Sequence, residues 1–261
     1  MSRSARARSW VMVELHGHAG AATMPPMSTP PPDSRPGLDK DPSAIAGMFD
    51  RVAARYDIVN DLLSLGQTKR WRRIVCDAVD AQPGERVLDL AAGTGTSSVP
   101  LLASGAQVVS ADFSLGMLAQ GRRQYPQVQF VAADALRLPF ADESFDAATM
   151  SFGLRNVSDL DLALSELRRV VRPGGRLVIC EFSTPTNPVL RTLYQRYLAS
   201  AVRRMAQMFA SNPSAYEYLA DSIAAWPEQS ALAARLQAVG WQQVQWRNLT
   251  GGIVAVHRSS R

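Results

Sequence analysis

Short apolar runs alternate with stretches of helical periodicity over most of the chain. The runs predict five strands, of which the first ends at Asp89 and the others span 106–111, 128–132, 145–152 and 177–182. The stretches after the second and fourth strands predict helices at 115–124 and 160–171. Strands that alternate with helices favour a parallel sheet, and the run at 177–182 is typical of a strand covered on both faces. The chain is therefore predicted to be an α/β protein.

Two further helices are predicted before the first strand. Ser43 is a candidate cap for a helix that contains Met48, Phe49, Val52 and Tyr56. A second helix places one apolar face along Trp71, Ile74, Val75, Ala78 and Val79. Ligands of doubly wound sheets lie outside the carboxyl ends of the strands, so these helices are placed to form a lid over a pocket. Plain packing helices are the alternative interpretation.

Beyond the fifth strand, residues 189–210 predict a long amphipathic helix. Its apolar stripe contains Leu190, Tyr194, Tyr197, Ala201, Met205 and Met208. Packing against the core is one explanation of this stripe, and an apolar substrate channel or a membrane-facing surface is the other. The runs 244–249 and 253–257 flank Thr250-Gly251-Gly252 and predict an antiparallel hairpin that closes the sheet.

Composition divides the chain at about residue 42. Residues 1–42 are rich in Pro, Ser and Gly and lack apolar periodicity, so they are predicted to be a disordered extension. The remainder, 43–261, is expected to form one domain, because 46% of the chain is hydrophobic and can bury a large core. Within it, 43–80 is expected to hold the lid helices and 185–225 a helical insertion on the substrate side.

Charge and cysteine content exclude several classes of function. The formal charge of +5 comes from 28 Lys and Arg against 23 Asp and Glu, but no basic run contains interleaved aromatics, so no nucleic-acid partner is expected. Cys76 and Cys180 lack metal-type spacing, which favours buried thiols, no metal site and a reducing cytoplasm. No apolar run reaches the length of about 18 residues that a spanning helix needs.

The turn after the first strand is the strongest candidate for ligand binding. Gly93, Thr94 and Gly95 follow Asp89, and their small size lets the backbone approach a ligand closely. The second strand is followed by Asp112, whose carboxylate can accept hydrogen bonds from the two vicinal hydroxyls of a ribose. These features predict a ligand that contains adenosine.

Residues around the turn narrow the choice of adenosine ligand. A dinucleotide fingerprint needs a third glycine where Ser98 stands, and no Lys-Ser or Lys-Thr follows to hold a triphosphate, so a nicotinamide oxidoreductase is disfavoured. The spacing from Asp89 through the turn to Asp112 resembles that of class I methyltransferases, which bind S-adenosylmethionine. Asp134 lies after the third strand, where it can accept the exocyclic amine of adenine; an exposed loop acid is the alternative.

Several motifs together resemble the family of menaquinone and ubiquinone C-methyltransferases. They are Met48-Phe49-Asp50, Tyr56-Asp57 with Asn60, Asp89-Leu90-Ala91-Ala92-Gly93-Thr94-Gly95, Ser151-Phe152-Gly153-Leu154-Arg155-Asn156-Val157, Arg172-Pro173-Gly174-Gly175-Arg176, Glu181-Phe182-Ser183 and Asn248-Leu249-Thr250-Gly251-Gly252. The resemblance covers about 43–257, and the motif that begins at Ser151 is its most restrictive part. It implies a class I, Rossmann-like fold with a mostly parallel seven-stranded sheet and a C-terminal antiparallel hairpin. Ala91 departs from the wider superfamily, in which a glycine is usual.

The resemblance also implies the ligands. S-adenosylmethionine is the expected cofactor, and the residues that correspond to its contacts are Thr94, Asp112, Asp134, Ala135 and Ser151, beside Asp89, Gly93 and Gly95 of the turn. The expected substrate is a polyprenylated quinol, 2-demethylmenaquinol, methylated on a ring carbon to give menaquinol. A methoxy-benzoquinol of ubiquinone biosynthesis and O-methylation of another small aromatic are the alternatives. A cytoplasmic protein in peripheral contact with the inner face of the membrane, or a homodimer, is compatible with these implications.

Methyl transfer to carbon needs a nucleophilic ring, which forms when a quinol hydroxyl loses its proton. The resemblance favours Arg155, with Asn156 and Tyr56, as the groups that stabilise the resulting phenolate. Arg155 cannot act as a base, because the pKa of a guanidinium lies above about 12. The alternative role of Arg155 is a hydrogen-bonded bridge from the lid helix to the sheet. His257 is expected to end a strand rather than to take part in catalysis.

Overall fold

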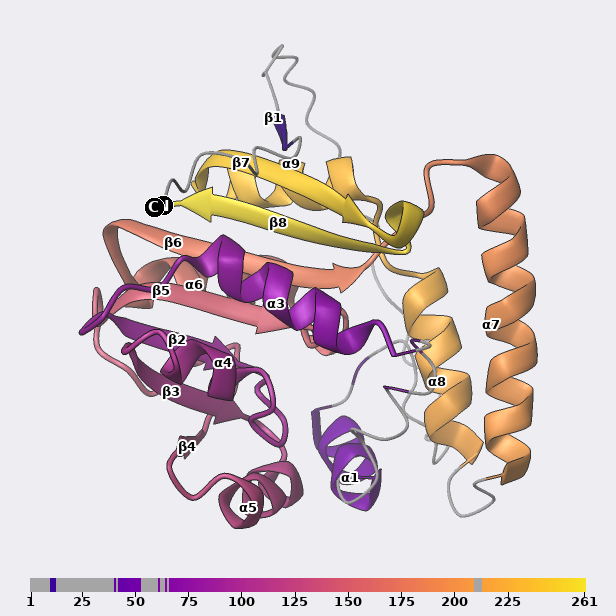
Figure 1. Cartoon of the computed structure of the whole chain (residues 1–261), viewed down its shortest axis with the longest axis horizontal. Helices are drawn as coiled ribbons and strands as arrows, with labels where there is room; N and C mark the ends of the chain where they lie inside the picture. Colours follow the sequence, from indigo (N-terminus) through magenta and orange to yellow (C-terminus); the bar gives the residue numbers. More distant parts are fainter. Residues whose placement is uncertain are drawn as a thin grey trace, which may run out of the picture.

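One eight-stranded sheet forms the centre of the computed structural model (Figure 1). The structure describes residues 10–12, 40, 42–52, 61, 64, 66–208 and 213–261. The strand order is β1-β7-β8-β6-β5-β2-β3-β4. The strands are β1 (Val11–Met12), β2 (Arg86–Leu90), β3 (Gln107–Asp112), β4 (Gln129–Ala132), β5 (Phe145–Ser151), β6 (Val171–Phe182), β7 (Gln242–Leu249) and β8 (Val254–Ser260).

The sheet has a parallel centre and an antiparallel side. Strands β4, β3, β2, β5 and β6 run parallel, and Leu88 of β2 lies opposite Val109 on β3 and Ala148 on β5. Strand β8 pairs antiparallel with both β6 and β7. Strands β2 to β8 confirm the predicted seven-stranded sheet with its C-terminal hairpin. The two-residue strand β1 is an addition that pairs antiparallel with β7 at the edge.

Two strands differ from the sequence-based expectation. Strand β6 begins at Val171 rather than at 177, so it includes Pro173-Gly174-Gly175. Its pairing with β5 is irregular there, because the register shifts between Val171 and Arg176, and such a bulge accommodates a proline that cannot donate to the ladder. Strand β1 lies in the extension 1–42, for which no strand was predicted. Most of that extension lies outside the described residues, so its disorder stays a prediction.

Helices cover both faces of the sheet. They are α1 (Pro42–Val52), α3 (Thr68–Val79), α4 (Ser98–Leu102), α5 (Leu115–Gln124), α6 (Leu160–Val170), α7 (Pro188–Met208), α8 (Pro213–Ala224) and α9 (Gln229–Ala238), with the short 3-10 helices η2 (Leu154–Asn156) and η3 (Thr250–Gly252). On one face, Trp71 and Val75 of α3 pack with Val87 and Val256, and most of the predicted apolar face of this helix is buried. On the other face, α6 and α9 pack against β2 and β5. Figure 1 shows α3 in front of the sheet and α6 behind it.

Three helices gather where the parallel strands end. Figure 1 shows α1, α7 and α8 along this edge, with α7 outermost. Helix α1 packs on α5, and α7 packs on α8. Helix α7 confirms the long helix predicted at 189–210, whereas α1 begins at Pro42, one residue before its expected cap, Ser43. Among the described residues, no helix is both long and apolar enough to cross a membrane.

Candidate active site

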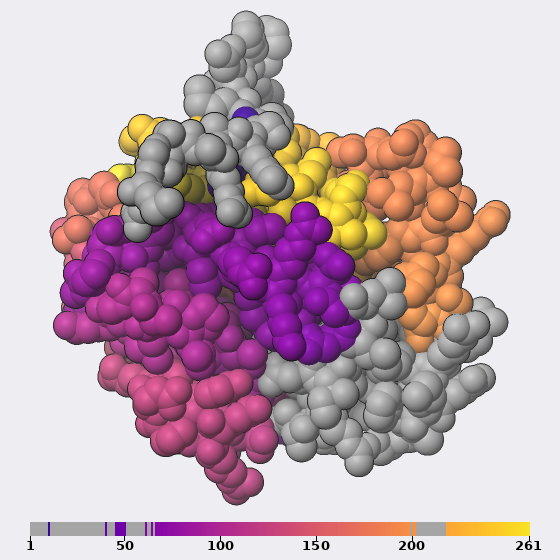
Figure 2. All heavy atoms as spheres, in the orientation of Figure 1, coloured from indigo at the N-terminus to yellow at the C-terminus, as the bar shows by residue number. Residues whose placement is uncertain are grey.

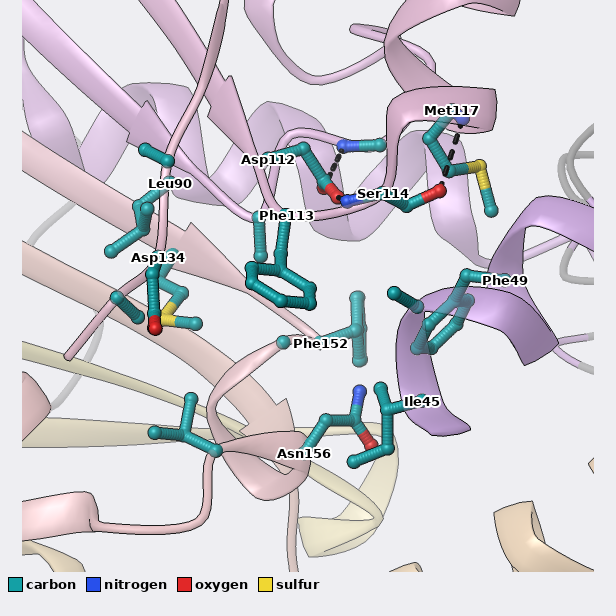
Figure 3. Close-up of a pocket in the computed structure, with 18 of the residues that line it drawn as sticks. Ile45, Phe49, Leu90, Asp112, Phe113, Ser114, Met117, Asp134, Phe152 and Asn156 are labelled. Atoms are coloured by element: carbon teal, nitrogen blue, oxygen red, sulfur yellow. Dashed lines mark hydrogen bonds between the residues drawn. The ribbon is translucent and has the colours of Figure 1, made fainter. Parts of the chain in front are cut away.

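A pocket opens at the carboxyl ends of β2, β3 and β5, beside α1 (Figure 3). Its volume is about 830 Å³, including its open mouth. Leu90, Met117 and Met150 contribute apolar surface to its wall. In Figure 3, Ile45 and Phe49 of α1 face Phe113 across this space. We call it the first pocket.

Asp112, the acid predicted at the end of the second strand, lines this pocket. Its Oδ2 accepts a hydrogen bond from the backbone N–H of Gly93 at 2.7 Å, and its Oδ1 accepts one from that of Ser114 at 2.8 Å (Figure 3). Burial raises the pKa of Asp112 above its ordinary value, while these backbone hydrogen bonds act in the opposite direction. Because each carboxylate oxygen can accept two hydrogen bonds, both can still accept one from a ligand.

The turn after β2 uses backbone conformations that small residues tolerate. Ala91 and Gly93 have φ angles of 56° and 58°, in the left-handed region. Gly95 has a φ of 81°, and a Cβ at this position would lie 2.6 Å from the ring of Phe130 on β4. Gly93 lines the first pocket and Gly95 does not. The role of Gly95 in the structure is therefore to let the turn pack closely on β4.

Asp89 lies fully buried below the turn and does not line the pocket. Its Oδ2 accepts hydrogen bonds from the hydroxyls of Ser97 at 2.8 Å and Ser98 at 2.6 Å. Burial raises the pKa of Asp89 to about 6, and the two serine hydrogen bonds act against this rise. Ser98, which stands where a dinucleotide site has its third glycine, thus ties the start of α4 to β2.

The remaining predicted cofactor residues divide between two cavities. Asp134, Ala135 and Ser151 line the first pocket, and Oδ1 of Asp134 accepts a hydrogen bond from the N–H of Leu136 at 2.9 Å. Thr94 is buried and lines a second cavity, which Ser151 also borders. The structure thus brings Gly93, Asp112, Asp134, Ala135 and Ser151 together in one pocket. Contacts with a cofactor stay a prediction for each of them.

Helix α1 is tied to the wall of the first pocket by Asp50. Its Oδ1 accepts hydrogen bonds from the hydroxyl of Ser114 at 2.5 Å and from the N–H of Gly116 at 2.8 Å. Both donors lie at the start of α5, where a negative charge is favourable because the N-terminus of a helix carries partial positive charge. This contact holds Ile45 and Phe49 against the pocket. Opening and closing of α1 as a lid stays a prediction.

The second cavity lies between α3, the ends of β5 and β6, and the pair α7 and α8. Its volume is about 1030 Å³, including its mouth. Most of its wall is apolar or aromatic, and the apolar and aromatic residues include Trp71, Val75, Phe152, Phe182, Tyr194, Tyr197, Leu198, Leu219 and Ile223. Tyr194 and Tyr197 belong to the stripe of α7, so the channel interpretation of that stripe agrees with their position.

The two cavities share one wall, built from Ala91, Gly93, Ser151 and Phe152. Gly153 packs closely on this wall, because a Cβ there would lie 2.3 Å from the Cβ of Ala91. The two cavities therefore adjoin at the turn after β2 and the end of β5.

Arg155 lines the second cavity and is held by Glu181. Its Nη1 lies 3.1 Å from Oε1 of Glu181, and the two side chains are only 5% and 2% exposed. The same nitrogen donates to the carbonyl of Phe152, and the guanidinium carbon lies 5.1 Å from the ring centre of Phe182. Within the described part of the chain, the buried Nε of Arg155 has no hydrogen-bond partner. The bridge formed by Arg155 runs from η2 to β6, and a bridge to the lid helix stays a prediction.

The other candidates for catalysis lie elsewhere or outside the described residues. Asn156 lines the first pocket, and its Oδ1 accepts a hydrogen bond from the hydroxyl of Tyr218 on α8 at 3.2 Å. Tyr56 lies outside the described residues. His257 is buried inside β8, with Nε2 2.9 Å from the carbonyl oxygen of Gln229, and burial lowers the pKa of His257 to about 4. Its structural role agrees with expectation, although it lies within the strand and not at its end.

Sequence reasoning assigned no site role to Glu181, Asp50 or Trp71. Glu181 and Asp50 stand in two of the motifs that carry the family resemblance, which was the available signal for them. Trp71 was assigned to the packing face of its helix, yet it also lines the second cavity, where its ring lies 5.8 Å from that of Phe152. Nothing in helical periodicity distinguishes a residue that faces a core from one that faces a cavity.

Comparison with known proteins identifies the family. The model of the ubiE/COQ5 methyltransferase family matches residues 38–261. The chain belongs to this family. Among ubiE/COQ5 methyltransferases, it is 63% identical to the demethylmenaquinone methyltransferase of Mycobacterium sp. (strain KMS) over 224 residues, 86% of this chain and 96% of the relative. The demethylmenaquinone methyltransferase of Streptomyces griseus subsp. griseus is 57% identical over 228 residues, 87% of this chain and 99% of the relative.

Solved structures confirm the predicted class I methyltransferase fold of this ubiE/COQ5 family member. A SAM-dependent methyltransferase of Thermotoga maritima, described as a possible histamine N-methyltransferase, superposes with a TM-score of 0.60 at 20% identity, over 83% of this chain and 99% of that one. The phosphoethanolamine N-methyltransferase 2 of Haemonchus contortus, solved with S-adenosyl-L-methionine, gives a TM-score of 0.56 at 14% identity over 75% and 53% of the two chains.

Proposed function

We propose that this ubiE/COQ5 methyltransferase transfers the methyl group of S-adenosylmethionine to a ring carbon of 2-demethylmenaquinol and so forms menaquinol. The names of the relatives support this substrate. The observation that carries the proposal is the wall common to both cavities, formed by Ala91, Gly93, Ser151 and Phe152. One cavity suits a nucleoside and the other an apolar aromatic molecule, and the reacting groups would come together where these four residues border both cavities.

The residues of the first pocket fit S-adenosylmethionine. Asp112 has both carboxylate oxygens oriented by backbone N–H groups, and each retains acceptor capacity for a ribose hydroxyl. Asp134 adds a second carboxylate at the end of the neighbouring strand, in reach of an adenine amine. Leu90, Met117 and Met150 supply apolar surface for the base. Acidic residues also suit a ligand whose sulfonium is positively charged.

The second cavity fits a prenylated quinol. Rings of Trp71, Phe152 and Phe182 lie at centre-to-centre distances of 5.8 and 5.1 Å along one side, which suits an aromatic head group. Leu198, Leu219 and Ile223 of α7 and α8 continue the apolar wall. Burial of the isoprenoid tail of the quinol in this cavity is favourable, because it removes apolar surface from water.

Bound S-adenosylmethionine supplies an electrophilic methyl carbon on a positively charged sulfur. The chain positions the quinol ring and the methyl donor in adjoining cavities. Because both are already held close together, less entropy is lost when they reach the in-line geometry of transfer. The chain also supplies stabilisation of the quinol oxygen as that oxygen loses its proton. Once water has accepted its proton, the oxygen raises electron density on the adjacent ring carbon, and this carbon releases its own hydrogen as a proton after it has accepted the methyl group.

We assign Arg155 to the stabilisation of that oxygen, because Arg155 lines the second cavity. Glu181 and the carbonyl of Phe152 occupy its Nη1. A positively charged guanidinium favours a nearby negative oxygen, and it keeps its own proton at any ordinary pH. Glu181 fixes the orientation of the guanidinium, so little reorganisation is needed when charge develops on the substrate.

Product analysis tests the proposal. The purified protein is incubated with 2-demethylmenaquinol in detergent and with S-adenosylmethionine that carries a labelled methyl group, and NMR locates the label. We expect a new methyl on the ring carbon. A methoxy product would establish O-methylation instead, and faster turnover of a polyprenyl methoxy-benzoquinol would establish the ubiquinone alternative.

An Arg155→Lys variant tests the assigned role of this residue. Lysine keeps the charge but lacks the planar fork and its Nε–H, so we expect kcat to fall by at least about tenfold while the affinity for S-adenosylmethionine is retained. Arg123→Lys, at an exposed position of α5, is the matched control. An unchanged kcat for Arg155→Lys would remove Arg155 from the mechanism.

A further inference from the structure

Helix α7 has one face directed into the protein. Tyr194 and Tyr197 line the second cavity, and a Cβ on Gly251 of η3 would lie 2.3 Å from Leu190, so that side chain also points inward. These three positions follow helical spacing. The inner face of α7 thus forms a wall of the proposed quinol cavity.

A second face of α7 is exposed to solvent. Val189 is 68% and Leu193 is 56% exposed, and with Leu115 at 66% they are the three most exposed large hydrophobic residues in the part of the chain that the structure describes. Arg196 and Ser200 are also exposed, and with Val189 and Leu193 they recur at intervals of three and four residues, on one side of the helix. We call these four residues the outer face. Figure 2 shows the first half of α7 at the outer flank of the molecule.

The charge along the sequence of α7 and its flanking segments has a single sign. From 182 to 216 the sequence contains four arginines, at 191, 196, 203 and 204, and no aspartate or glutamate. Elsewhere the chain mixes both signs, with 28 basic and 23 acidic residues in total. Exposed apolar side chains next to arginines, with no acid between them, match the chemistry of a surface that presents anionic head groups above an apolar layer.

We propose that the outer face of α7 docks the protein on an anionic lipid surface, with Val189 and Leu193 entering the boundary of the acyl chains. This inference rests on the proposed quinol substrate, because a polyprenylated quinol resides in lipid. The inner face of the same helix lines the second cavity, so docking places the cavity next to the source of its substrate. The quinol then reaches the cavity without crossing water.

The charges favour lipid over a second copy of this chain as the occupant. An isologous contact would place Arg196 of one copy near the same arginine-rich segment of the other. Like charges at such a contact repel, whereas phosphate groups of lipids attract them. The apolar pair Val189 and Leu193 is also small, which suits shallow insertion better than a dimer interface.

Vesicle binding tests the proposal with the full chain. Flotation is measured with vesicles of phosphatidylcholine mixed with phosphatidylglycerol, and with vesicles of phosphatidylcholine alone. We expect binding to the mixed vesicles, reduced at least about tenfold in the double variant Val189→Glu with Leu193→Glu and about fivefold in Arg196→Gln. Leu162→Glu is the control, because Leu162 is 44% exposed on α6, which Figure 1 shows behind the sheet and not beside α7.

The outcomes separate this inference from the proposed function. Equal binding of the double variant and the control to mixed vesicles would overturn it, and so would a double variant that only converts a dimer into a monomer. Activity adds a second readout: the double variant should keep turnover of a short-chain quinol in solution and lose turnover of a long-chain quinol in vesicles. If no quinol is methylated, the proposed function fails, while the vesicle result still decides the docking surface.

Discussion

Replacing Asp112 by alanine should weaken the binding of S-adenosylmethionine more than any other single change in the first pocket. Asp112 orients the turn through its bonds to the N–H groups of Gly93 and Ser114, and it is the acceptor proposed for two ribose hydroxyls. The variant therefore loses the ligand contacts, and it also leaves two backbone donors of the pocket wall without their acceptor.

The size of the effect follows from the hydrogen bonds. Each hydrogen bond to a charged group contributes about 1.5–3 kcal/mol, and two bonds to one carboxylate are not fully additive. A loss of about 3 kcal/mol raises Kd about a hundredfold. Asp134→Ala removes one proposed contact, to the adenine amine, so its Kd should rise by about tenfold.

Isothermal titration calorimetry with S-adenosylmethionine measures these constants directly. Asp77→Ala, which removes an exposed acid on α3, controls for the change in net charge, and thermal unfolding confirms that each variant is folded. If Asp112→Ala bound the ligand within about threefold of the unmodified protein, the assignment of the first pocket to the adenosine moiety would be refuted.

Three further changes test the geometry of the site and its surroundings. Glu181→Ala should lower the free energy of unfolding by about 3–5 kcal/mol in urea denaturation, because it leaves Arg155 buried without its partner. The double variant with Arg155→Ala should lose less stability, and a loss below about 1 kcal/mol in the single variant would contradict the pairing. Gly153→Ala should lower kcat by at least about tenfold, because its Cβ would lie 2.3 Å from that of Ala91. Adding Ala91→Gly to this variant should restore turnover, and no recovery would argue against the shared wall. Burial lowers the pKa of His257 from 6.5 to about 4, so between these pH values only the unfolded state binds the proton, and the free energy of unfolding falls by about 3 kcal/mol as the pH falls through this window. His257→Gln should remove this part of the pH dependence in denaturation curves. The same dependence of the free energy of unfolding on pH in both proteins would refute the assignment.

Much of this protein was predictable because its signals are local. Apolar runs predict the parallel strands, and the carboxyl ends of parallel strands meet at one edge, so Asp112 and Asp134 were expected near the glycine turn before their contacts were known. The restrictive motif that begins at Ser151 indicated the protein family as well. These inferences need only a few consecutive residues and the general geometry of a sheet.

Tertiary structure alone decided which side chains meet. The pairing of Arg155 with Glu181, the contact of Asp50 with Ser114 and the wall shared by the two cavities join segments that are distant along the chain. No periodicity encodes such pairs, because helical and strand spacing determines only which face a residue occupies, not which element packs against that face. The sequence by itself therefore determined the fold, the glycine turn and the acids at the strand ends. Tertiary packing determined how these features form a site with two adjoining cavities.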